Sequence, residues 1–445
     1  MSVHSLCSSR GTWLSLIGLA VLLRAGVMFH APESLTDDRD LYLGIASEMQ
    51  AGNGFATPGS RPPRATAFRP PLYPVLLLVT GGQALGIGTL HLLLAGGMVV
   101  ATGMAARRFA GCGTTSSWGT CITAAGIVAI DPLLVLYSGQ PMTETLCSCL
   151  SAGLLWAMSA GVSESENSSS SQRTLRRTIL IGGLWGLCLL ARPTYAAAFA
   201  VWLAGSLILS GERSARWSDR LRSGCLTAII AMAVLSPWVL RNWSVFGTPI
   251  ATTTHGGYTL WLANNPVYYL EVVERGDAVW DGDSLHRWQT ETNQEMDQHQ
   301  IRGEVAQDRW QGEKARTFIR ENPGRFAWAC AYRASRFWSI WPGRPGETGL
   351  PRVVLWMVAG GYAALWLAAI IALGRSLIHG RWLMLLATGS LIFGFFLVHL
   401  VYWTDARMRA PIMPAIAVLV AVGLSRPKRS APPSTATPHD NTPSA

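Results

Sequence analysis

Residues 353–373 read VVLWMVAGGYAALWLAAIIAL, a run of 21 residues without a charged side chain. A helix of this length crosses the hydrocarbon core of a bilayer, which is about 30 Å thick. Comparable apolar runs recur along the chain. They lack the polar and apolar alternation of barrel strands, and only helices or closed barrels satisfy their backbone in lipid. The sequence therefore predicts an all-α polytopic membrane protein.

The composition supports this class. The chain has 445 residues, of which 49% are hydrophobic and 14% are charged, and its mean hydropathy is +0.26. A soluble chain carries about 25% charged residues, so a cytosolic enzyme and a disordered chain are both excluded. The net charge of +10 comes from arginines near helix ends, and Lys314 and Lys428 are the only lysines. We read this excess as a topology signal and expect no nucleic-acid partner.

The apolar runs divide the chain into four parts. We expect a transmembrane module over 1–240, whose first outer loop (30–70) is catalytic, and a mixed or α-rich extracytoplasmic domain over 241–350. C-terminal transmembrane helices follow over 351–424, and then a disordered cytoplasmic tail over 425–445. The stretch 71–85 is short and broken by glycines, so we expect it to lie at the interface. About ten spans are predicted, at 11–29, 90–106, 118–137, 142–160, 178–191, 194–210, 225–240, 353–373, 382–403 and 410–424.

Charge predicts the orientation. If the N-terminus is cytoplasmic, every short inner loop is basic, as the excess of Lys and Arg in cytoplasmic loops requires. Both termini are then cytoplasmic. The inner loops hold Arg107, Arg108, Arg173, Arg176, Arg177, Arg213, Arg216, Arg220, Arg222, Arg375, Arg381, Arg426, Lys428 and Arg429.

The same orientation places the unusual polar residues on the outer side. Ionisable groups at a membrane are costly, so a one-sided cluster of both signs indicates a site. A transporter would need polar groups near the midplane, and for this reason a lipid-linked sugar transporter or flippase is the alternative and not the first choice. The outer residues are Asp37, Asp38, Asp40, Arg69, Asp131, Glu144, Arg192, Arg241, Asn242, Asp405, Arg407 and Arg409.

The acids after the first span allow more than one interpretation. Leu41, Ile45 and Met49 have helical spacing, so Asp37 and Asp38 precede a helix, where one carboxylate serves as a cap. Further carboxylates exceed what a cap requires. They would either hold a divalent metal or supply a general base, and the residues alone leave these alternatives open.

The arginines suggest an anionic ligand. Arg69 stands before two prolines at the membrane surface, where a guanidinium can bind phosphate through two hydrogen bonds or can simply extend toward the interface. Arg241, Arg407 and Arg409 lie at the outer ends of other spans. Asp405 and Arg409 are spaced to form a pair that stabilises a helix start. Glu144 lies just inside a span and is either structural or part of the site.

Aromatic residues are frequent over 241–350. Aromatic rings stack on sugars, but they also anchor a domain to the membrane interface. Trp338 and Trp341 precede a span, which favours the anchor role for these two. The polar stretch 283–320 is predicted to form helices on the surface. The tryptophans are Trp261, Trp280, Trp288, Trp310, Trp328, Trp338 and Trp341.

The order of several loose motifs resembles a known family. An outer Asp-x-x-x-Tyr ending at Tyr42 is followed by Gly-x-Gly-Phe, Arg-Pro-Pro-Leu-Tyr-Pro and Pro-x-Thr-Glu ending at Glu144. Ala-Arg-Pro-Thr, Pro-Trp-x-x-Arg-Asn, Glu-Asn-Pro-Gly-Arg-Phe and Arg-Met-Arg-Ala-Pro-x-x-Pro follow in that order. Over residues 12–424 the chain resembles the bacterial C-type membrane glycosyltransferases related to protein O-mannosyltransferases and to the lipid A aminoarabinose transferase.

The resemblance implies a fold and a reaction. It implies the C-type glycosyltransferase fold and the transfer of a sugar, with inversion, from a polyprenyl phosphate to a glycan, lipid or protein acceptor. The reaction would take place outside the bacterial inner membrane. Counting back from Tyr42 puts the catalytic base at Asp38, although Arg39 stands where the family has a second acid, so Asp37 stays an alternative and metal binding is open. Glu144 matches a second acid and Arg69 a phosphate ligand. Further candidates are Arg241, Arg407 and Arg409 for the phosphate, with Tyr42, Arg192, Asn242 and Asn264.

The chemistry fits this reading. A glycosyl phosphate has a good leaving group, so transfer needs a carboxylate to accept the proton of the acceptor and cations to stabilise the departing phosphate. A hydrolase would need a second acid facing the first, and Glu144 or Asp131 could supply it.

Overall fold

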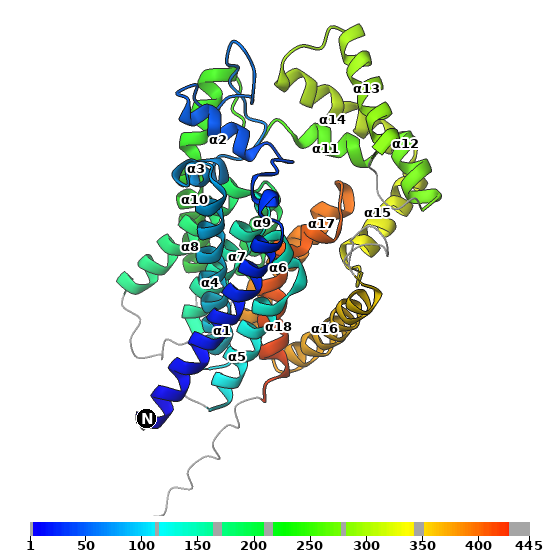
Figure 1. The fold of residues 1–445 in the computed structure, drawn as a ribbon. Helices are drawn as coiled ribbons and strands as arrows, with labels where there is room; N and C mark the ends of the chain where they lie inside the picture. The colour runs from blue at the N-terminus through cyan, green and yellow to red at the C-terminus, as the bar shows by residue number, and fades with distance from the viewer. Residues whose placement is uncertain are drawn as a thin grey trace, which may run out of the picture.

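The structure is a computed structural model of the 445-residue chain, and it describes residues 3–111, 115–162, 171–208, 217–276, 282–341 and 351–426. The described residues are mostly helical, and their β-structure is limited to an isolated bridge between Ala56 and Ala65. Figure 1 shows a bundle of long helices with a group of shorter helices above it. The predicted all-α class is confirmed. The predicted tail lies outside the described residues apart from its first two.

Seven segments in the described chain are long and apolar enough to cross a membrane. The expected number of about ten spans is not confirmed. The helices α5 (Thr115–Ile130) and α9 (Tyr195–Ile208) are apolar but shorter, and α7 (Glu144–Ser159) has 16 residues. The seven are α1 (Val3–His30), α4 (Ala84–Phe109), α8 (Ser171–Ala191), α10 (Trp217–Phe246), α16 (Arg352–Ile378), α17 (Trp382–Val401) and the pair η4 (Ala406–Ile412) and α18 (Met413–Leu424).

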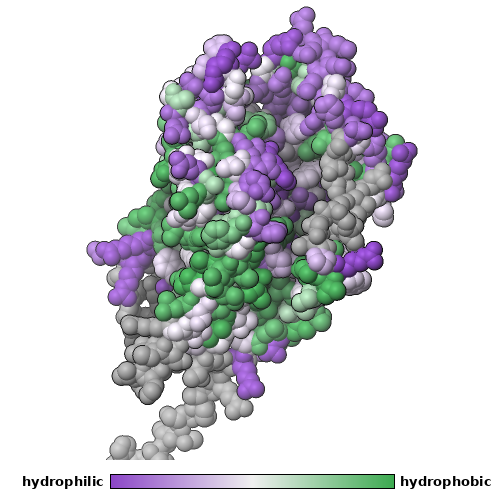
Figure 2. Space-filling model, viewed as in Figure 1, coloured by the Kyte–Doolittle hydropathy of each residue, from purple (hydrophilic) through white to green (hydrophobic). Residues whose placement is uncertain are grey.

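Large apolar side chains face outward along these helices. Leu22, Leu93, Ile229, Met357 and Ile370 are all more than 60% exposed. Figure 2 shows hydrophobic residues over the middle and lower helices, with hydrophilic residues gathered at the top. Such a surface is stable only against lipid, so the protein is a multi-pass membrane protein.

The smaller elements gather at one end of the bundle. We call this the α2 end; here α1 ends at His30 and α4 begins at Ala84. The first loop forms η1 (Pro32–Thr36), α2 (Tyr42–Gln50) and α3 (Leu72–Val79). A second core joins the helices after α10, and two of these helices lie in the stretch 283–320 that is predicted to be helical. They are α11 (Gly256–Ala263), α12 (Pro266–Tyr268), the π-helix η3 (Tyr269–Glu274), α13 (Gly282–Gln298), α14 (Glu304–Glu321) and α15 (Pro323–Phe337).

The predicted span 118–137 is not one helix. The chain breaks after α5, and α6 (Pro132–Tyr137) follows. Pro132 has no N–H to continue the first helix, and the Asp131 carboxylate accepts a hydrogen bond of 2.9 Å from the Leu134 N–H. A local proline and cap therefore override the apolar pattern.

Candidate functional site

Five ionisable side chains from distant parts of the chain meet at the α2 end. Two belong to the first loop, and the other three stand at helix ends. Glu144 is the first residue of α7, Arg192 follows α8, and Arg407 lies in η4 before α18. Their side chains are 3–22% exposed, so the group is sunk into the protein but reachable. We call Asp40, Arg69, Glu144, Arg192 and Arg407 the charged cluster.

Arg69 and Arg407 converge on Asp40. Arg69 donates to the Asp40 backbone carbonyl over 2.7 Å and to its carboxylate over 3.1 Å. Arg407 Nη1 lies 3.4 Å from the other carboxylate oxygen. A guanidinium has five N–H donors, so Arg69 keeps donors beyond these two.

Glu144 lies between Arg192 and Arg407. Its Oε1 is 3.5 Å from Arg192 Nη1 and 3.6 Å from Arg407 Nε. Glu144 Oε2, Arg192 Nη1 and Arg407 Nε are buried and have no hydrogen-bond partner among the described residues. A buried polar atom left unsatisfied costs about 1–3 kcal/mol, and more when charged. The arrangement can therefore hold a ligand that supplies both acceptors and donors.

The neighbouring acids have separate surroundings. Asp38 is half-buried and accepts the Leu43 N–H at 3.0 Å and the Gly44 N–H at 2.6 Å, so it caps α2 as one interpretation expected. Asp37 is exposed and pairs with Arg39 at 2.6 Å. Of the two, Asp38 alone has a carboxylate fixed in place by the fold.

Tyr42 forms the apolar wall of the cluster. Tyr42 is buried, and the centroids of its ring and the Tyr73 ring are 5.2 Å apart. The Arg69 guanidinium carbon lies 5.2 Å from the Tyr42 ring centroid. Burial raises the pKa of Tyr42 to about 12, although Arg69 acts in the opposite direction. The phenol therefore keeps its proton at neutral pH and can donate a hydrogen bond.

Two carboxylates hold the first loop in shape. Glu48 accepts hydrogen bonds from Asn53, the Gly59 N–H and Arg61, and these bonds lower its pKa. Glu304, which begins α14, accepts from Thr66 Oγ1 at 2.7 Å, the Ala67 N–H at 2.6 Å and Thr254 Oγ1 at 3.0 Å. Glu304 thus fastens the helices after α10 to the loop that carries Arg69. Neither role is indicated by a motif or a pattern in the sequence.

Several candidates from the sequence support the fold and lie apart from the cluster contacts. Arg241 donates to the carbonyls of Thr66 and Phe55, and Asn242 accepts from Arg241 and donates to Ile250. Asn264 accepts from Tyr269 and donates to the carbonyls of Leu260 and Val401.

Arg409 is also not in the cluster contacts. It donates to the Phe337 and Ser339 carbonyls and lies 4.4 Å from the Tyr362 ring centroid. The predicted ion pair between Asp405 and Arg409 is not found among the described residues. Asp405 instead accepts the Arg407 N–H and lies 3.9 Å from Arg407 Nε.

Asp40 belongs to the outer polar residues of the sequence but not to the predicted catalytic or phosphate-binding residues. It stands in the same Asp-Asp-Arg-Asp stretch, and the available signal is its place two residues before Tyr42. Among the described residues no group of three His, Cys, Asp or Glu side chains is arranged to hold a metal. Asp37 and Asp38 have different partners.

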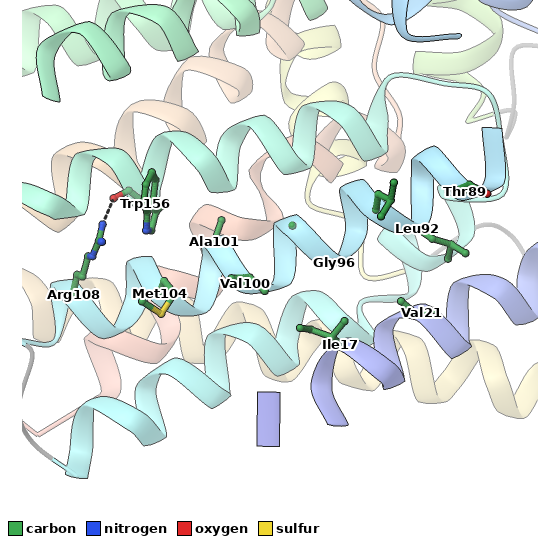
Figure 3. A pocket seen from close by; sticks show the side chains of 12 residues that line it. Ile17, Val21, Thr89, Leu92, Gly96, Val100, Ala101, Met104, Arg108 and Trp156 are labelled. Carbon is green, nitrogen blue, oxygen red and sulfur yellow. Dashed lines mark hydrogen bonds between the residues drawn. The ribbon is translucent and has the colours of Figure 1, made fainter. Parts of the chain in front are cut away.

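A long groove elsewhere is lined by apolar residues. It has a volume of about 870 Å³ and lies between α1, α4 and Trp156 of α7. Figure 3 shows it following α4 from Thr89 to Arg108, and Arg108 donates to the Trp156 carbonyl at 3.2 Å. Its lining suits alkyl chains of lipid and supplies no carboxylate.

Comparisons with known proteins support the fold. No family model matches the chain, and no curated protein matches its sequence. The archaeal oligosaccharyltransferase AglB from Archaeoglobus fulgidus, in complex with an inhibitory peptide and a dolichol-phosphate, has a similar structure with a TM-score of 0.51 and 11% identity. The alignment covers 92% of this chain and 50% of AglB.

Two further structures are similar. AglB tethered to an acceptor peptide gives a TM-score of 0.52 at 12% identity, over 92% of this chain and 49% of that one. ArnT from Cupriavidus metallidurans, bound to undecaprenyl phosphate, gives 0.41 at 12% identity, over 96% and 78%. The chain spans about half the length of AglB. The similarity to AglB confirms the predicted C-type glycosyltransferase fold.

Proposed function

We propose that this protein is an integral-membrane glycosyltransferase that moves a sugar from a polyprenyl-phosphate donor to an acceptor on the extracytoplasmic side of a bacterial inner membrane. The observation that carries the proposal is the charged cluster, in which buried guanidinium and carboxylate atoms have no hydrogen-bond partner in the described part of the chain, and whose Asp40 is two residues along the chain from the ordered carboxylate of Asp38. AglB and ArnT bind dolichol-phosphate and undecaprenyl phosphate, and the AglB fold supports a donor of this kind.

In the proposed reaction an acceptor hydroxyl or amine attacks the anomeric carbon while the bond from that carbon to the phosphate oxygen breaks. The acceptor proton goes to Asp38, and the electron pair of the broken bond goes to the phosphate. Attack from the face opposite the phosphate inverts the configuration. A positioned base of this type contributes about 10²–10⁴-fold to the rate.

Arg69, Arg192 and Arg407 are proposed to bind the phosphate. Charge-assisted hydrogen bonds from guanidinium groups stabilise the negative charge that grows as the sugar leaves. In this arrangement the Glu144 carboxylate lies between the Arg192 and Arg407 guanidinium groups and positions both. The Asp40 carboxylate orients Arg69 and Arg407. Tyr42 gives an apolar wall that strengthens these charge interactions.

The proposed orientation has both termini in the cytoplasm, residues 30–70 and 241–350 outside the membrane, and the segments 1–240 and 351–424 containing the spans. The basic loop after α4, which is predicted to be an inner loop, lies at the far end of α4 from the α2 end. The helix begins at the α2 end with Ala84, and Arg107 and Arg108 are in its last turn. Acceptors of three classes, glycan, lipid or protein, remain compatible with the reaction itself.

Radiolabelled polyprenyl-phosphate sugars, added to membranes containing the protein, test the proposal. We expect the label to move from the donor to an acceptor, and Arg69→Ala to reduce this transfer at least 100-fold. Arg287→Ala is the matched control, because this exposed α13 arginine lies 4.0 Å from Glu271 and outside the cluster. Donor that only crosses the bilayer, with its sugar intact, would show a flippase and overturn the proposal.

A further inference from the structure

Two adjoining chambers lie between the first loop and the α13–α14 pair. The smaller has a volume of about 370 Å³ and the larger about 910 Å³. Phe68, Glu304 and Gln307 line both, so the chambers are direct neighbours. Ligand sites in proteins typically occupy about 300–1,000 Å³.

The smaller chamber combines aromatic rings with amides. Its aromatic residues are Phe68, Tyr258 and Trp288, and the Tyr258 and Trp288 ring centroids are 6.1 Å apart. Aromatic rings cover the apolar faces of sugars, while amides donate to and accept from sugar hydroxyls. The amide side chains are Gln289, Asn293, Gln307 and Gln311.

Two of these amides have capacity for a ligand. The side chains of Asn293 and Gln307 make no hydrogen bond among those found in the described chain, whereas Gln289 donates to the Tyr258 hydroxyl at 2.9 Å. Asp308 adds a carboxylate, and its Oδ1 accepts the Gly257 N–H at 2.6 Å. The chamber thus offers donors and acceptors around a ring-lined space, which is the chemistry of a saccharide site.

The larger chamber is positively charged. Arg64, Arg302 and Arg309 line it, and its carboxylate Glu304 already accepts three hydrogen bonds from the first loop and Thr254. Arg302 pairs with Asp297 at 2.5 Å, which leaves Arg64 and Arg309 without an ion pair among the described contacts. An acidic group is therefore favoured here over a neutral one.

The chambers adjoin the charged cluster. Leu41 lines the larger chamber and stands between Asp40 and Tyr42 in the chain. Phe68 lines both chambers, and the guanidinium of its neighbour Arg69 lies 4.9 Å from its ring centroid. A ligand in the chambers would therefore lie against the chain neighbours of Asp40 and Arg69.

We propose that the two chambers bind an acidic oligosaccharide, with a sugar ring in the smaller chamber and a carboxylate or phosphate substituent in the larger. That this saccharide is the acceptor rests on the proposed transferase function; its binding does not. The acceptor class is thereby a glycan or the glycan part of a glycolipid.

Binding to the protein in nanodiscs, without donor, tests this inference. Saturation-transfer NMR would compare trigalacturonate, neutral maltotriose and tetraglutamate, which has carboxylates but no sugar. We expect trigalacturonate to bind at least tenfold more tightly than the other two. Asn293→Ala with Gln307→Ala should weaken it at least fivefold, and Arg64→Ala with Arg309→Ala should abolish its advantage over maltotriose.

The matched control is Gln294→Ala with Gln298→Ala, since these exposed α13 amides do not line either chamber. Failure of trigalacturonate to bind, equal binding of tetraglutamate or maltotriose, or equal effects of the control pair would each overturn the inference. Binding of trigalacturonate with no sugar transfer would overturn the proposed function and leave the saccharide site standing. Sugar transfer without trigalacturonate binding would overturn the saccharide site and leave the proposed function standing.

Discussion

Arg407 is the side chain that joins the two halves of the charged cluster. Its Nη1 lies 3.4 Å from Asp40 of the first loop, and its Nε lies 3.6 Å from Glu144 of α7. Nη1 also contacts the Met142 sulfur at 2.9 Å, a weak acceptor for a guanidinium. Because the carboxylate and sulfur contacts at these distances leave strong donors of Arg407 underused, the phosphate of the proposed donor would gain more from Arg407 than it displaces.

The three acids near Tyr42 should differ sharply when each is replaced by asparagine. We expect Asp38→Asn to lower transfer at least 100-fold, because the amide keeps one of the two bonds accepted from the Leu43 and Gly44 N–H groups but cannot accept the proton. Asp40→Asn should weaken donor binding more than it lowers the rate at saturation, because it releases Arg69 and Arg407. Asp37→Asn should stay within twofold of the parent. Steady-state kinetics with labelled donor measure all three, and full activity of Asp38→Asn would refute the assignment of the base.

His255 should make stability depend on pH. It lies between Phe68 and Tyr258, and burial, aided by Arg69, holds its pKa well below the usual 6.5. Below pH 6.5 the unfolded chain takes up a proton that the folded chain refuses, so stability falls as pH falls, by at most about 1.4 kcal/mol per pH unit for one proton. Thermal melts from pH 7.5 to 5.5 should show a smaller loss for His255→Phe than for the parent.

Burial raises the pKa of the nearby Asp308, so the folded chain takes up a proton at Asp308 more readily than the unfolded chain does. The effect of Asp308 on stability during acidification therefore has the opposite sign to that of His255. The difference between the parent and His255→Phe isolates the histidine from this effect. Parallel melting curves of the two proteins across the range would contradict the prediction.

The sequence identified many of the residues of the site but not their contacts. Arg69, Glu144, Arg192 and Arg407 were candidates because charges are costly at a membrane, and the fold brings them together. Asp40 was not selected from the three neighbouring acids, because the turn before α2 decides which carboxylate faces the arginines. Leu41 in that turn has φ 64°, a left-handed conformation that no apolar pattern signals.

At the scale of elements, α8 packs closely against α10 through two glycines. A Cβ on Gly186 would lie 2.5 Å from the Val234 Cβ, and one on Gly182 would lie 2.8 Å from the Ile230 Cβ. Small residues four apart let membrane helices approach, so Gly186→Ala should destabilise the pair by about 1–3 kcal/mol. Gly183→Ala, with nothing within 4 Å, is the control. Apparent melting temperatures in detergent measure the effect, and equal values for both variants would contradict it.

The link through Glu304 should govern order in the first loop. Glu304→Gln keeps the size of the side chain but weakens three hydrogen bonds, each worth more when its acceptor is charged. We expect faster hydrogen exchange at residues 65–67 and slower transfer. Glu313→Gln on the exposed face of α14 is the control. Unchanged exchange at 65–67 in Glu304→Gln would show that the contact does not hold the loop.

The apolar runs predicted where most elements lie, since lipid enforces helices wherever the chain is long and apolar. They did not predict the break at Asp131, where a proline and a cap act locally. Nor could they predict the contact of Glu304 with Thr66, because a pairing between residues 238 positions apart depends on the finished fold.

At the scale of the whole molecule, the orientation in the membrane follows from charge and can be tested directly. Gln294 on α13 and His379 between α16 and α17 are exposed and lie at opposite ends of the fold in the proposed topology. Short loops rich in arginine stay in the cytoplasm, so the loop between Arg375 and Arg381 should be inside. In spheroplasts, a membrane-impermeant maleimide should label Gln294→Cys at once and His379→Cys only after permeabilisation. The parent protein is the blank for its own cysteines. Labelling of His379→Cys in sealed spheroplasts, with Gln294→Cys protected, would invert the topology and place the charged cluster on the cytoplasmic side.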